Sequence, residues 1–316
     1  MQKSSQQIVD IAIIGGGPAG ISAAIYATYD GNSCVVFEEH TLAWIPEKHI
    51  NILSGIEGFP GLTNKIKGTE LVSMYRESLA FMKVTPQEHE KVITIERLKS
   101  DYIIRTTSKE YLAKSVILCT GTIPKKLNLP DEEIYAENNL YYFCYGEEDK
   151  YRGKNVLVVG GRNSGATAAK HLANNGAKVT IIEIKDRLQA KDKHTHEFES
   201  LGIKTLTSTS ITKLLGNNGI LTGVELLSDG NSLQMDYDAI FVYIGVDPNN
   251  ALALALGVKV DDFGYVLVDN KQQTSIPGVF AAGDLCGNLK HVVAASGQGG
   301  TAAYIANQYI QMLKTA

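Results

Sequence analysis

Two glycine-rich segments have the spacing of a dinucleotide-binding fingerprint. Residues 11–24 read IAIIGGGPAGISAA and residues 156–169 read VLVVGGRNSGATAA. Each runs from a short β-branched strand through glycines into an alanine-rich helix. In this fingerprint the first glycine permits a tight turn, the second lets the backbone approach a pyrophosphate, and the third lets helix and strand pack closely. The helix N-terminus adds N–H groups that bind phosphate.

Each segment is followed by a second strand that ends in an acidic residue. Residues 35–37 precede Glu38, and residues 180–182 precede Glu183. An acid at this point binds the ribose hydroxyls of a nucleotide. Because both patterns are complete from strand to acid, the sequence predicts two nucleotide sites. The turns of these sites are assigned to Gly15, Gly17 and Gly20 in the first and to Gly160 and Gly165 in the second.

Composition and charge exclude several classes of partner. The net charge is −4 and no long basic run exists, which argues against nucleic acid. No apolar run is long enough to cross a bilayer, and the polar N-terminus does not have the pattern of a secretory signal. The cysteines are far apart in sequence, so reduced thiols in a cytoplasm are expected rather than a disulfide framework. They are Cys34, Cys119, Cys144 and Cys286.

The second fingerprint interrupts a domain that resumes after it. Residues 115–121 and 239–245 are apolar strands that end in glycine, and a turn follows each of them. We interpret these turns as two crossings between domains. Strands that alternate with helices predict the α/β class. We expect two Rossmann-like, three-layer ββα nucleotide-binding domains, the second inserted into the first: residues 1–124 with 247–316, and residues 125–246.

Several motifs together resemble the low-molecular-weight thioredoxin reductase family of flavoproteins, over nearly the whole chain. They are GGGPAG at residues 15–20, EGFPG at 57–61, CTG at 119–121, YRGK at 151–154, the second glycine loop, and Gly283-Asp284. The resemblance implies FAD in the outer domain, a pyridine nucleotide in the central domain, and a homodimer. It also implies that domain rotation presents a nicotinamide or a redox dithiol alternately to the flavin.

The resemblance assigns residues to the FAD site. A helix start together with Lys290 would stabilise negative charge on a reduced flavin. One departure from the family is Glu47-Lys48-His49, which replaces a Gly-Gly-Gln segment and alters the wall of the flavin pocket. Trp44, just before it, is expected to be a half-buried core residue, with stacking on an aromatic ring as the alternative. The assigned residues are Gly15, Gly17, Pro18, Ala19, Gly20, Glu38, Gly121, Gly283, Asp284, Lys290, His291 and Val292.

The redox dithiol of the family is missing. Where the family has Cys-x-x-Cys, residues 143–146 read FCYG, and Cys144 is the candidate catalytic residue. A dithiol relay needs two sulfurs within bonding distance. Cys286 could serve as a distant partner of Cys144. Otherwise Cys119 and Cys286 are expected to be buried packing residues.

The central nucleotide site also departs from the family. Arg162 stands where the close-approach glycine belongs, so it either obstructs a pyrophosphate or binds it through the guanidinium. Where NADPH-using members of the family carry a cationic cluster after the second strand, this chain has Glu183-Ile184-Lys185-Asp186-Arg187. Glu183 should repel a 2′-phosphate, although Lys185 and Arg187 partly offset that repulsion. The balance of these charges favours NADH over NADPH. It equally favours any other adenosine nucleotide with an unmodified ribose, including a second FAD. The candidate residues are Gly160, Arg162, Asn163, Ser164, Glu183 and Lys185.

These features predict an FAD-dependent oxidoreductase that is not a standard thioredoxin reductase. NADH is the leading electron donor, and the acceptor is a small redox protein or a small molecule. One alternative is a flavoenzyme that uses ferredoxin or a second flavin instead of a pyridine nucleotide. Another is a flavin-bearing redox sensor with little turnover. No metal is predicted, because His194 and His196 lack nearby cysteines or paired carboxylates.

Overall fold

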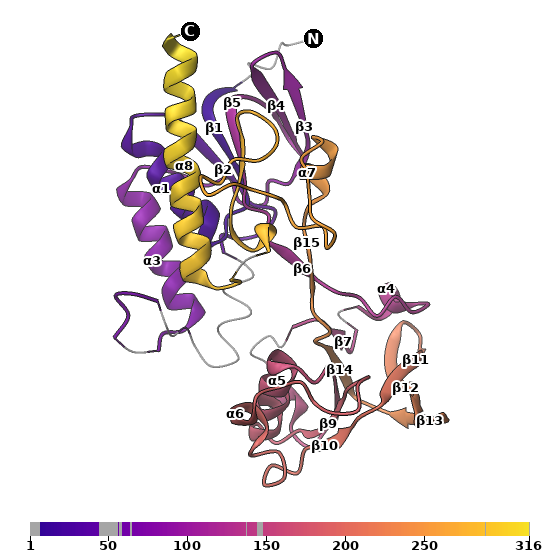
Figure 1. Cartoon of the computed structure of the whole chain (residues 1–316). Helices are drawn as coiled ribbons and strands as arrows, with labels where there is room; N and C mark the ends of the chain where they lie inside the picture. Colours follow the sequence, from indigo (N-terminus) through magenta and orange to yellow (C-terminus); the bar gives the residue numbers. More distant parts are fainter. Residues whose placement is uncertain are drawn as a thin grey trace. The chain divides into compact units, whose positions relative to one another are not determined.

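A computed structural model describes residues 7–43, 56, 59–63, 65–136, 138–143, 148–287 and 289–315 (Figure 1). Trp44, residues 47–49 and Cys144, for which the sequence makes specific predictions, lie outside the described residues.

Contacts between residues divide the chain into two compact units. Unit 1 draws its described residues from Met1–Glu47, Gly55–Ile123 and Asp247–Ala316, and unit 2 draws them from Pro124–Val246. The two connecting segments, β6 (Thr122–Pro124) and β15 (Val246–Pro248), pair with each other in a two-stranded sheet. The Lys125 N–H also donates to the carbonyl of Gly245 at 3.0 Å.

Unit 1 is built on a six-stranded sheet with the order β2-β1-β5-β4-β3 and β16 beside β5. The C-terminal half of β5 is parallel to β16, whereas its N-terminal half is antiparallel to β4. This division joins a parallel layer to a small antiparallel one. The strands are β1 (Gln7–Ile14), β2 (Cys34–Phe37), β3 (Val92–Leu98), β4 (Asp101–Thr106), β5 (Glu110–Leu118) and β16 (Val279–Ala281).

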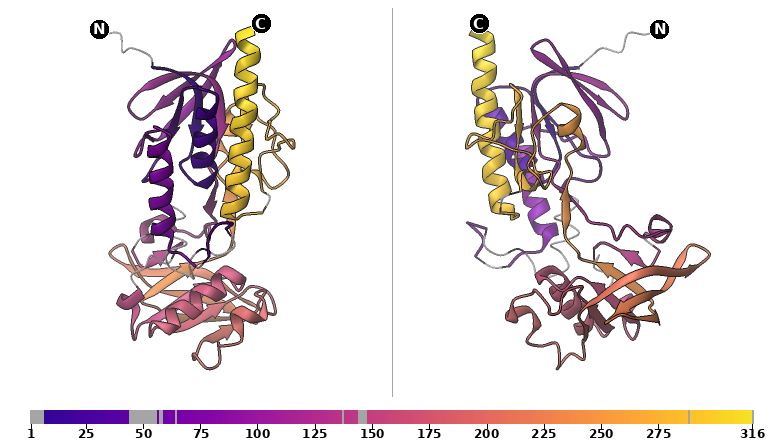
Figure 2. Two further views of the ribbon diagram at one scale, coloured as in Figure 1. Left: turned by 90° about the vertical axis from the view of Figure 1, so that its left-hand side faces the viewer. Right: turned by 45° about the vertical axis from the view of Figure 1, so that its right-hand side comes forward.

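Three long helices lie side by side on one face of this sheet (Figure 2). They are α1 (Pro18–Tyr29), α3 (Gly68–Phe81) and α8 (Val292–Thr315), and the short elements α7 (Ala251–Ala255) and η2 (Gly283–Cys286) complete the unit. None of the described helices, α8 included, is both long and apolar enough to cross a membrane.

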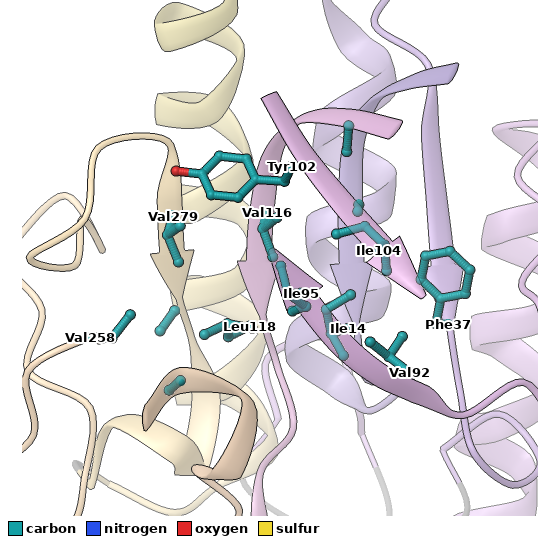
Figure 3. Close-up of a cluster of buried hydrophobic side chains, with 14 of the residues drawn as sticks. Ile14, Phe37, Val92, Ile95, Tyr102, Ile104, Val116, Leu118, Val258 and Val279 are labelled. Atoms are coloured by element: carbon teal, nitrogen blue, oxygen red, sulfur yellow. The ribbon is translucent and has the colours of Figure 1, made fainter. Parts of the chain in front are cut away.

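The core of unit 1 follows from the period-two pattern of its strands. Side chains at alternate positions point to one face of the sheet, as Val116 and Leu118 do in Figure 3. The intervening residues, such as Ile13 and Ile117, are also buried. Strands covered on both faces read as continuous apolar runs, which is the pattern of a parallel sheet.

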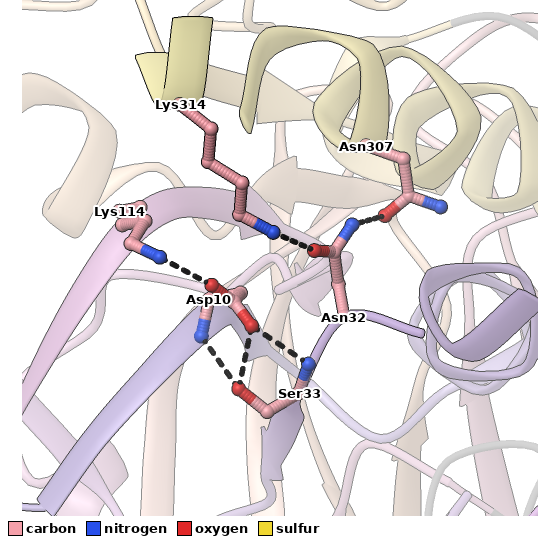
Figure 4. A network of polar contacts seen from close by, with 6 residues as sticks. All are labelled: Asp10, Asn32, Ser33, Lys114, Asn307 and Lys314. Atoms are coloured by element: carbon pink, nitrogen blue, oxygen red, sulfur yellow. Dashed lines mark hydrogen bonds and ion pairs between the residues drawn. The ribbon is translucent and has the colours of Figure 1, made fainter. Parts of the chain in front are cut away.

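A polar network ties the end of α1 to α8 (Figure 4). Asn32 is 4% exposed and Asn307 is 1% exposed, so their amides require protein partners. The Asn32 side-chain amide donates to Asn307 Oδ1 at 2.9 Å, and the Asn307 amide donates to the Tyr26 carbonyl at 3.1 Å. Lys314 donates to Asn32 Oδ1 at 3.3 Å. These bonds fix the helix pair that stands behind the first glycine loop.

Unit 2 repeats the architecture around a five-stranded parallel sheet with the order β10-β9-β8-β14-β7. A three-stranded antiparallel sheet, β11-β12-β13, lies beside it. The confirmed fold class is therefore α/β with two Rossmann-like units. The elements are α4 (Glu132–Tyr135), β7 (Leu140–Tyr141), η1 (Glu148–Tyr151), β8 (Asn155–Val159), α5 (Asn163–Asn174), β9 (Lys178–Ile182), α6 (Asp192–Thr195), β10 (Lys204–Leu206), β11 (Thr209–Asn217), β12 (Ile220–Ser228), β13 (Asn231–Asp236) and β14 (Ala239–Val242).

The buried amide pair should contribute measurably to stability. Replacing Asn307 by Ala leaves the buried Asn32 amide and the Tyr26 carbonyl without their partner, which should lower the free energy of unfolding by about 1–3 kcal/mol. Urea denaturation measures this change. Gln308→Ala, an exposed position on the same helix, is the matched control. Equal stability of the two variants would contradict the assignment.

Candidate functional site

The two glycine loops have the same backbone. Gly15 has a φ of +111° and Gly160 a φ of +109°, a conformation that favours glycine. A Cβ at Gly15 would lie 2.2 Å from the carbonyl oxygen of Cys119. A Cβ at Gly160 would lie 2.3 Å from that of Tyr243. Each first position therefore requires glycine for two reasons: the positive φ of the turn, and the close carbonyl group that follows a neighbouring strand.

The third glycine of each loop lets a helix approach the turn. A Cβ at Gly20 would lie 1.8 Å from the Gly15 carbonyl oxygen, and a Cβ at Gly165 would lie 1.9 Å from that of Gly160. No side chain fits in either place. The helices α1 and α5 consequently begin directly at the turn, with their N-termini at the carboxyl ends of β1 and β8.

Both acidic residues bind the backbone of their own loop. Glu38 accepts from the Gly16 N–H at 2.7 Å and from the His40 N–H at 3.0 Å. Glu183 accepts from the Gly161 N–H at 2.8 Å and from the Lys185 N–H at 3.1 Å. Each carboxylate oxygen thus has one backbone donor and retains a lone pair for a ligand hydroxyl. The two units hold their acids in the same way.

The second glycine is where the loops differ. Gly17 is the N-cap of α1 with φ −78° and ψ −175°, and Arg162 is the N-cap of α5 with φ −87° and ψ 179°. Both conformations are extended, so the arginine causes no backbone strain. A Cβ at Gly17 would meet nothing within 4 Å, which leaves open space at the helix start. In unit 2 the exposed Arg162 side chain begins at the corresponding position.

The first turns of both helices have no side-chain cap. Pro18 occupies the first helical position of α1, where its missing N–H costs nothing, and buried Ala19 follows it. In α5 the first two positions are Asn163 and Ser164, both exposed. Asn163 Oδ1 accepts from the Lys191 N–H at 3.0 Å, so the Asn163 side chain binds a neighbouring loop.

The loop that contains Lys191 lies beside α5 and brings several lysines close to His194. The N–H groups of Gln189 and Ala190 donate to the Gly161 carbonyl at 2.8 and 2.9 Å. Farther on, His194 Nδ1 lies 3.1 Å from Thr167 Oγ1. Burial lowers the pKa of His194, and the charges of Lys193, Lys170 and Lys191 lower it further. The sequence pattern identified Lys185 and Arg187 after Glu183 but missed these lysines, because their position depends on tertiary contacts.

Of the remaining candidate residues of unit 1, Gly283 lies against the first turn of α1. Gly283 has a φ of +80°, and a Cβ there would lie 3.0 Å from the Cβ of Ala19. The Gly283 N–H donates to Gln298 Oε1 at 2.8 Å. Burial raises the pKa of Asp284, while the charges of Lys290 and His291 oppose that rise. The last two precede Val292, which begins α8.

Three residues that the sequence analysis did not assign to a site make hydrogen bonds in this part of unit 1: Asn249, Asn250 and Tyr265. Asn249 donates its N–H to the Gly121 carbonyl at 3.0 Å. The side-chain amide of Asn250 donates to the Gly264 carbonyl at 2.6 Å. Lys290 Nζ donates to the Tyr265 hydroxyl at 2.6 Å. Asn249 lies in the turn that follows residues 239–245, and the turn-forming run Asp261-Asp262-Phe263-Gly264 precedes Tyr265, but neither turn by itself indicates a ligand site.

Two cysteines of unit 1 are buried packing residues. Cys119 is 6% exposed and Cys286 is 9% exposed. Burial, with the charge of Asp284, raises the pKa of Cys286 to about 12. Burial also raises the pKa of Cys119, with a contribution from the neighbouring Cys286. A thiol that stays protonated is a poor nucleophile. Burial of Cys119 and Cys286 fits the expectation that they are packing residues.

Comparison with known proteins identifies relatives along the whole chain. A family model described as pyridine nucleotide-disulphide oxidoreductase matches residues 9–299. The thioredoxin reductase of Listeria monocytogenes is 29% identical, covering 98% of this chain and 97% of that protein. A 34.2 kDa protein in the rubredoxin operon of Clostridium pasteurianum is 32% identical, covering 98% and 99%. The crystal structure of T. acidophilum thioredoxin reductase superimposes with a TM-score of 0.85 at 30% identity, covering 98% and 100%.

Burial and the raised pKa values predict that Cys119 and Cys286 resist alkylation in the folded protein. At pH 8 both thiols are protonated and enclosed, so iodoacetamide should label them only after denaturation. Peptide mass spectrometry after timed labelling measures this for each cysteine. Urea-unfolded protein is the control, since all thiols should then react. Labelling of Cys286 in the folded protein at the unfolded rate would contradict this account.

Proposed function

The chain belongs to the pyridine nucleotide-disulphide oxidoreductase family, an enzyme family, and from this premise we propose that it binds FAD in unit 1 and NADH in unit 2. Electrons would then reach an acceptor without a Cys-x-x-Cys relay. The observation that carries the proposal is the duplication of one loop geometry. Each unit pairs a first glycine near φ +110° with a carboxylate held by the loop.

The residues of unit 1 fit FAD. The open space at Gly17 would admit a pyrophosphate, and the N–H groups at the start of α1 would bind it. Glu38 would accept from ribose hydroxyls. Asp284 is partly buried and its side chain makes no hydrogen bond within the described residues, so it can bind a ligand hydroxyl. When bound, FAD supplies the two-electron chemistry, and the protein supplies binding and charge.

Unit 2 supports NADH as the donor. Glu183 is 7% exposed and fixed at the ribose end of the loop, where a 2′-phosphate would meet a carboxylate. Arg162 stands at the helix start, where a pyrophosphate would need countercharge. The backbone of Arg162 is extended and causes no strain, and its side chain is exposed. We propose that the guanidinium binds phosphate through two parallel hydrogen bonds.

The acceptor and the assembly stay predictions. A small redox protein or a small molecule is the proposed acceptor, and Cys144 is the one thiol that the family resemblance places near it. For the homodimer implied by the resemblance, we propose a contact surface on α1 and α3. Tyr29, Met74 and Phe81 are exposed there, Phe81 to 85%. Exposed apolar groups gathered on one face are typical of association surfaces.

Anaerobic reduction of the flavin tests the proposed donor. NADH should bleach the flavin absorbance at lower concentration than NADPH, because Glu183 repels the additional phosphate. Glu183→Gln should narrow the difference between the two nucleotides. Reduced ferredoxin as the sole effective donor would contradict the proposal. So would a clear preference of the unaltered protein for NADPH.

Gly17→Glu, which places a carboxylate at the start of α1 where the pyrophosphate is proposed to lie, should abolish FAD binding. A Cβ at Gly17 would meet no protein atom within 4 Å, and a longer side chain would extend from it into the space proposed for the pyrophosphate. Folding should therefore be preserved, which circular dichroism of the FAD-free proteins checks. The FAD content follows from absorbance after reconstitution. Full FAD occupancy in this variant would refute the assignment of the site.

Arg162→Gly should weaken nucleotide binding in unit 2. The backbone of Arg162 matches that of Gly17, so glycine fits without rearrangement and only the guanidinium is lost. Loss of a charge-assisted contact to phosphate costs about 1.5–3 kcal/mol. Isothermal titration with NADH and ADP-ribose measures the change, and Lys213→Ala, an exposed cation on β11, is the control. Tighter binding by Arg162→Gly would show that the arginine obstructs the site.

A further inference from the structure

The ammonium of Lys290 is held in place at the start of α8. A lysine side chain has several rotatable bonds, and free rotation would spread its charge over a wide volume of solvent. Here Nζ donates to the Tyr265 hydroxyl at 2.6 Å and lies 4.5 Å from the centre of the Tyr265 ring. The hydrogen bond and the cation–π contact together restrict the charge to one position.

Tyr265 is itself fixed by a tight hairpin. Its N–H donates to Asp261 Oδ1 at 2.9 Å, and its carbonyl accepts from the Asp261 N–H at 2.9 Å. The ring lies against Gly287, where a Cβ would approach it to 2.6 Å. The next residue, Val266, donates its N–H to the Leu285 carbonyl at 3.0 Å. The hairpin is therefore joined to the η2 turn that contains Asp284.

The Lys290 charge acts on the carboxyl group of Asp284. The Asp284 carboxyl is partly buried, and its burial raises its pKa, while Lys290 and His291 are the cations that oppose this rise. An uncompensated carboxylate beside a flavin would disfavour the negative charge that a reduced flavin carries. A cation held close to it has the opposite effect. The balance depends on where Lys290 is held.

We propose that Tyr265 is a positioning residue that raises the reduction potential of the bound flavin by holding Lys290 at the start of α8. The inference rests on the proposed function, since it requires FAD in unit 1. Tyr265 acts through Lys290 and needs no contact with the flavin. Removing the hydroxyl alone takes away the hydrogen bond and leaves only the ring contact, so the ammonium should be held less firmly and its effect on the reduced state should weaken.

The two-electron midpoint potential of the FAD-loaded protein tests this inference by dye equilibration. Tyr265→Phe should lower the ratio of affinities for reduced and oxidised flavin by up to about tenfold, which corresponds to about 30 mV for a two-electron couple. Lys290→Met should lower it at least as much. The double variant should match Lys290→Met, because Tyr265 has no effect once the ammonium is absent. Phe263→Leu, on the same hairpin and 80% exposed, is the control and should leave the potential unchanged.

Two results would overturn the inference while leaving the proposed function intact. One is normal FAD content with an unchanged potential in Tyr265→Phe. The other is a pair of shifts that add in the double variant, which would mean that Tyr265 acts independently of Lys290. Failure of the unaltered protein to bind FAD would instead contradict the proposed function itself. Melting temperatures of the FAD-free proteins separate a change in potential from a loss of folding.

Discussion

The site depends on how closely a strand and a helix approach each other at one turn. In unit 1 the Cα of Gly20 lies so near the carbonyl of Gly15 that a Cβ would come within 1.8 Å of its oxygen. This packing brings the N-terminus of α1 to the carboxyl end of β1, where free N–H groups and the helix dipole favour an anion. The carboxylate of Glu38 and the Gly283-Asp284 turn are arranged around that point.

In unit 2 the strand and the helix approach each other equally closely, and the loop differs from that of unit 1 only where this close approach does not require glycine. Gly160 and Gly165 cannot carry side chains, whereas position 162 has an extended backbone that accepts any residue. The arginine at this position adds a charged side chain to the site without changing the backbone of the loop. Residues 143–146 read FCYG, where the family resemblance leads one to expect Cys-x-x-Cys. One fold can keep its geometry while the residues that carry the chemistry of its sites differ.

Local patterns could predict the parts of the site that depend on sequence neighbours. The turn glycines and the acids follow from strand–turn–helix spacing. The segment Lys290-His291-Val292-Val293 is expected to start the last helix, and α8 begins within it, at Val292. The contact between Tyr265 and Lys290 spans 25 residues, and that between Thr167 and His194 spans 27. Such contacts depend on how hairpins and loops pack, which spacing alone does not reveal. The proximity of Cys119 to Cys286 was missed for the same reason.

The central claim is that the two loops hold two different dinucleotides, and native mass spectrometry tests it most directly. The chain is exchanged into volatile buffer with excess FAD and NADH, and the mass of the complex gives the number and kind of bound nucleotides. We predict one FAD and one NADH per chain. Saturation with a single nucleotide, or with two FAD molecules, would contradict the account.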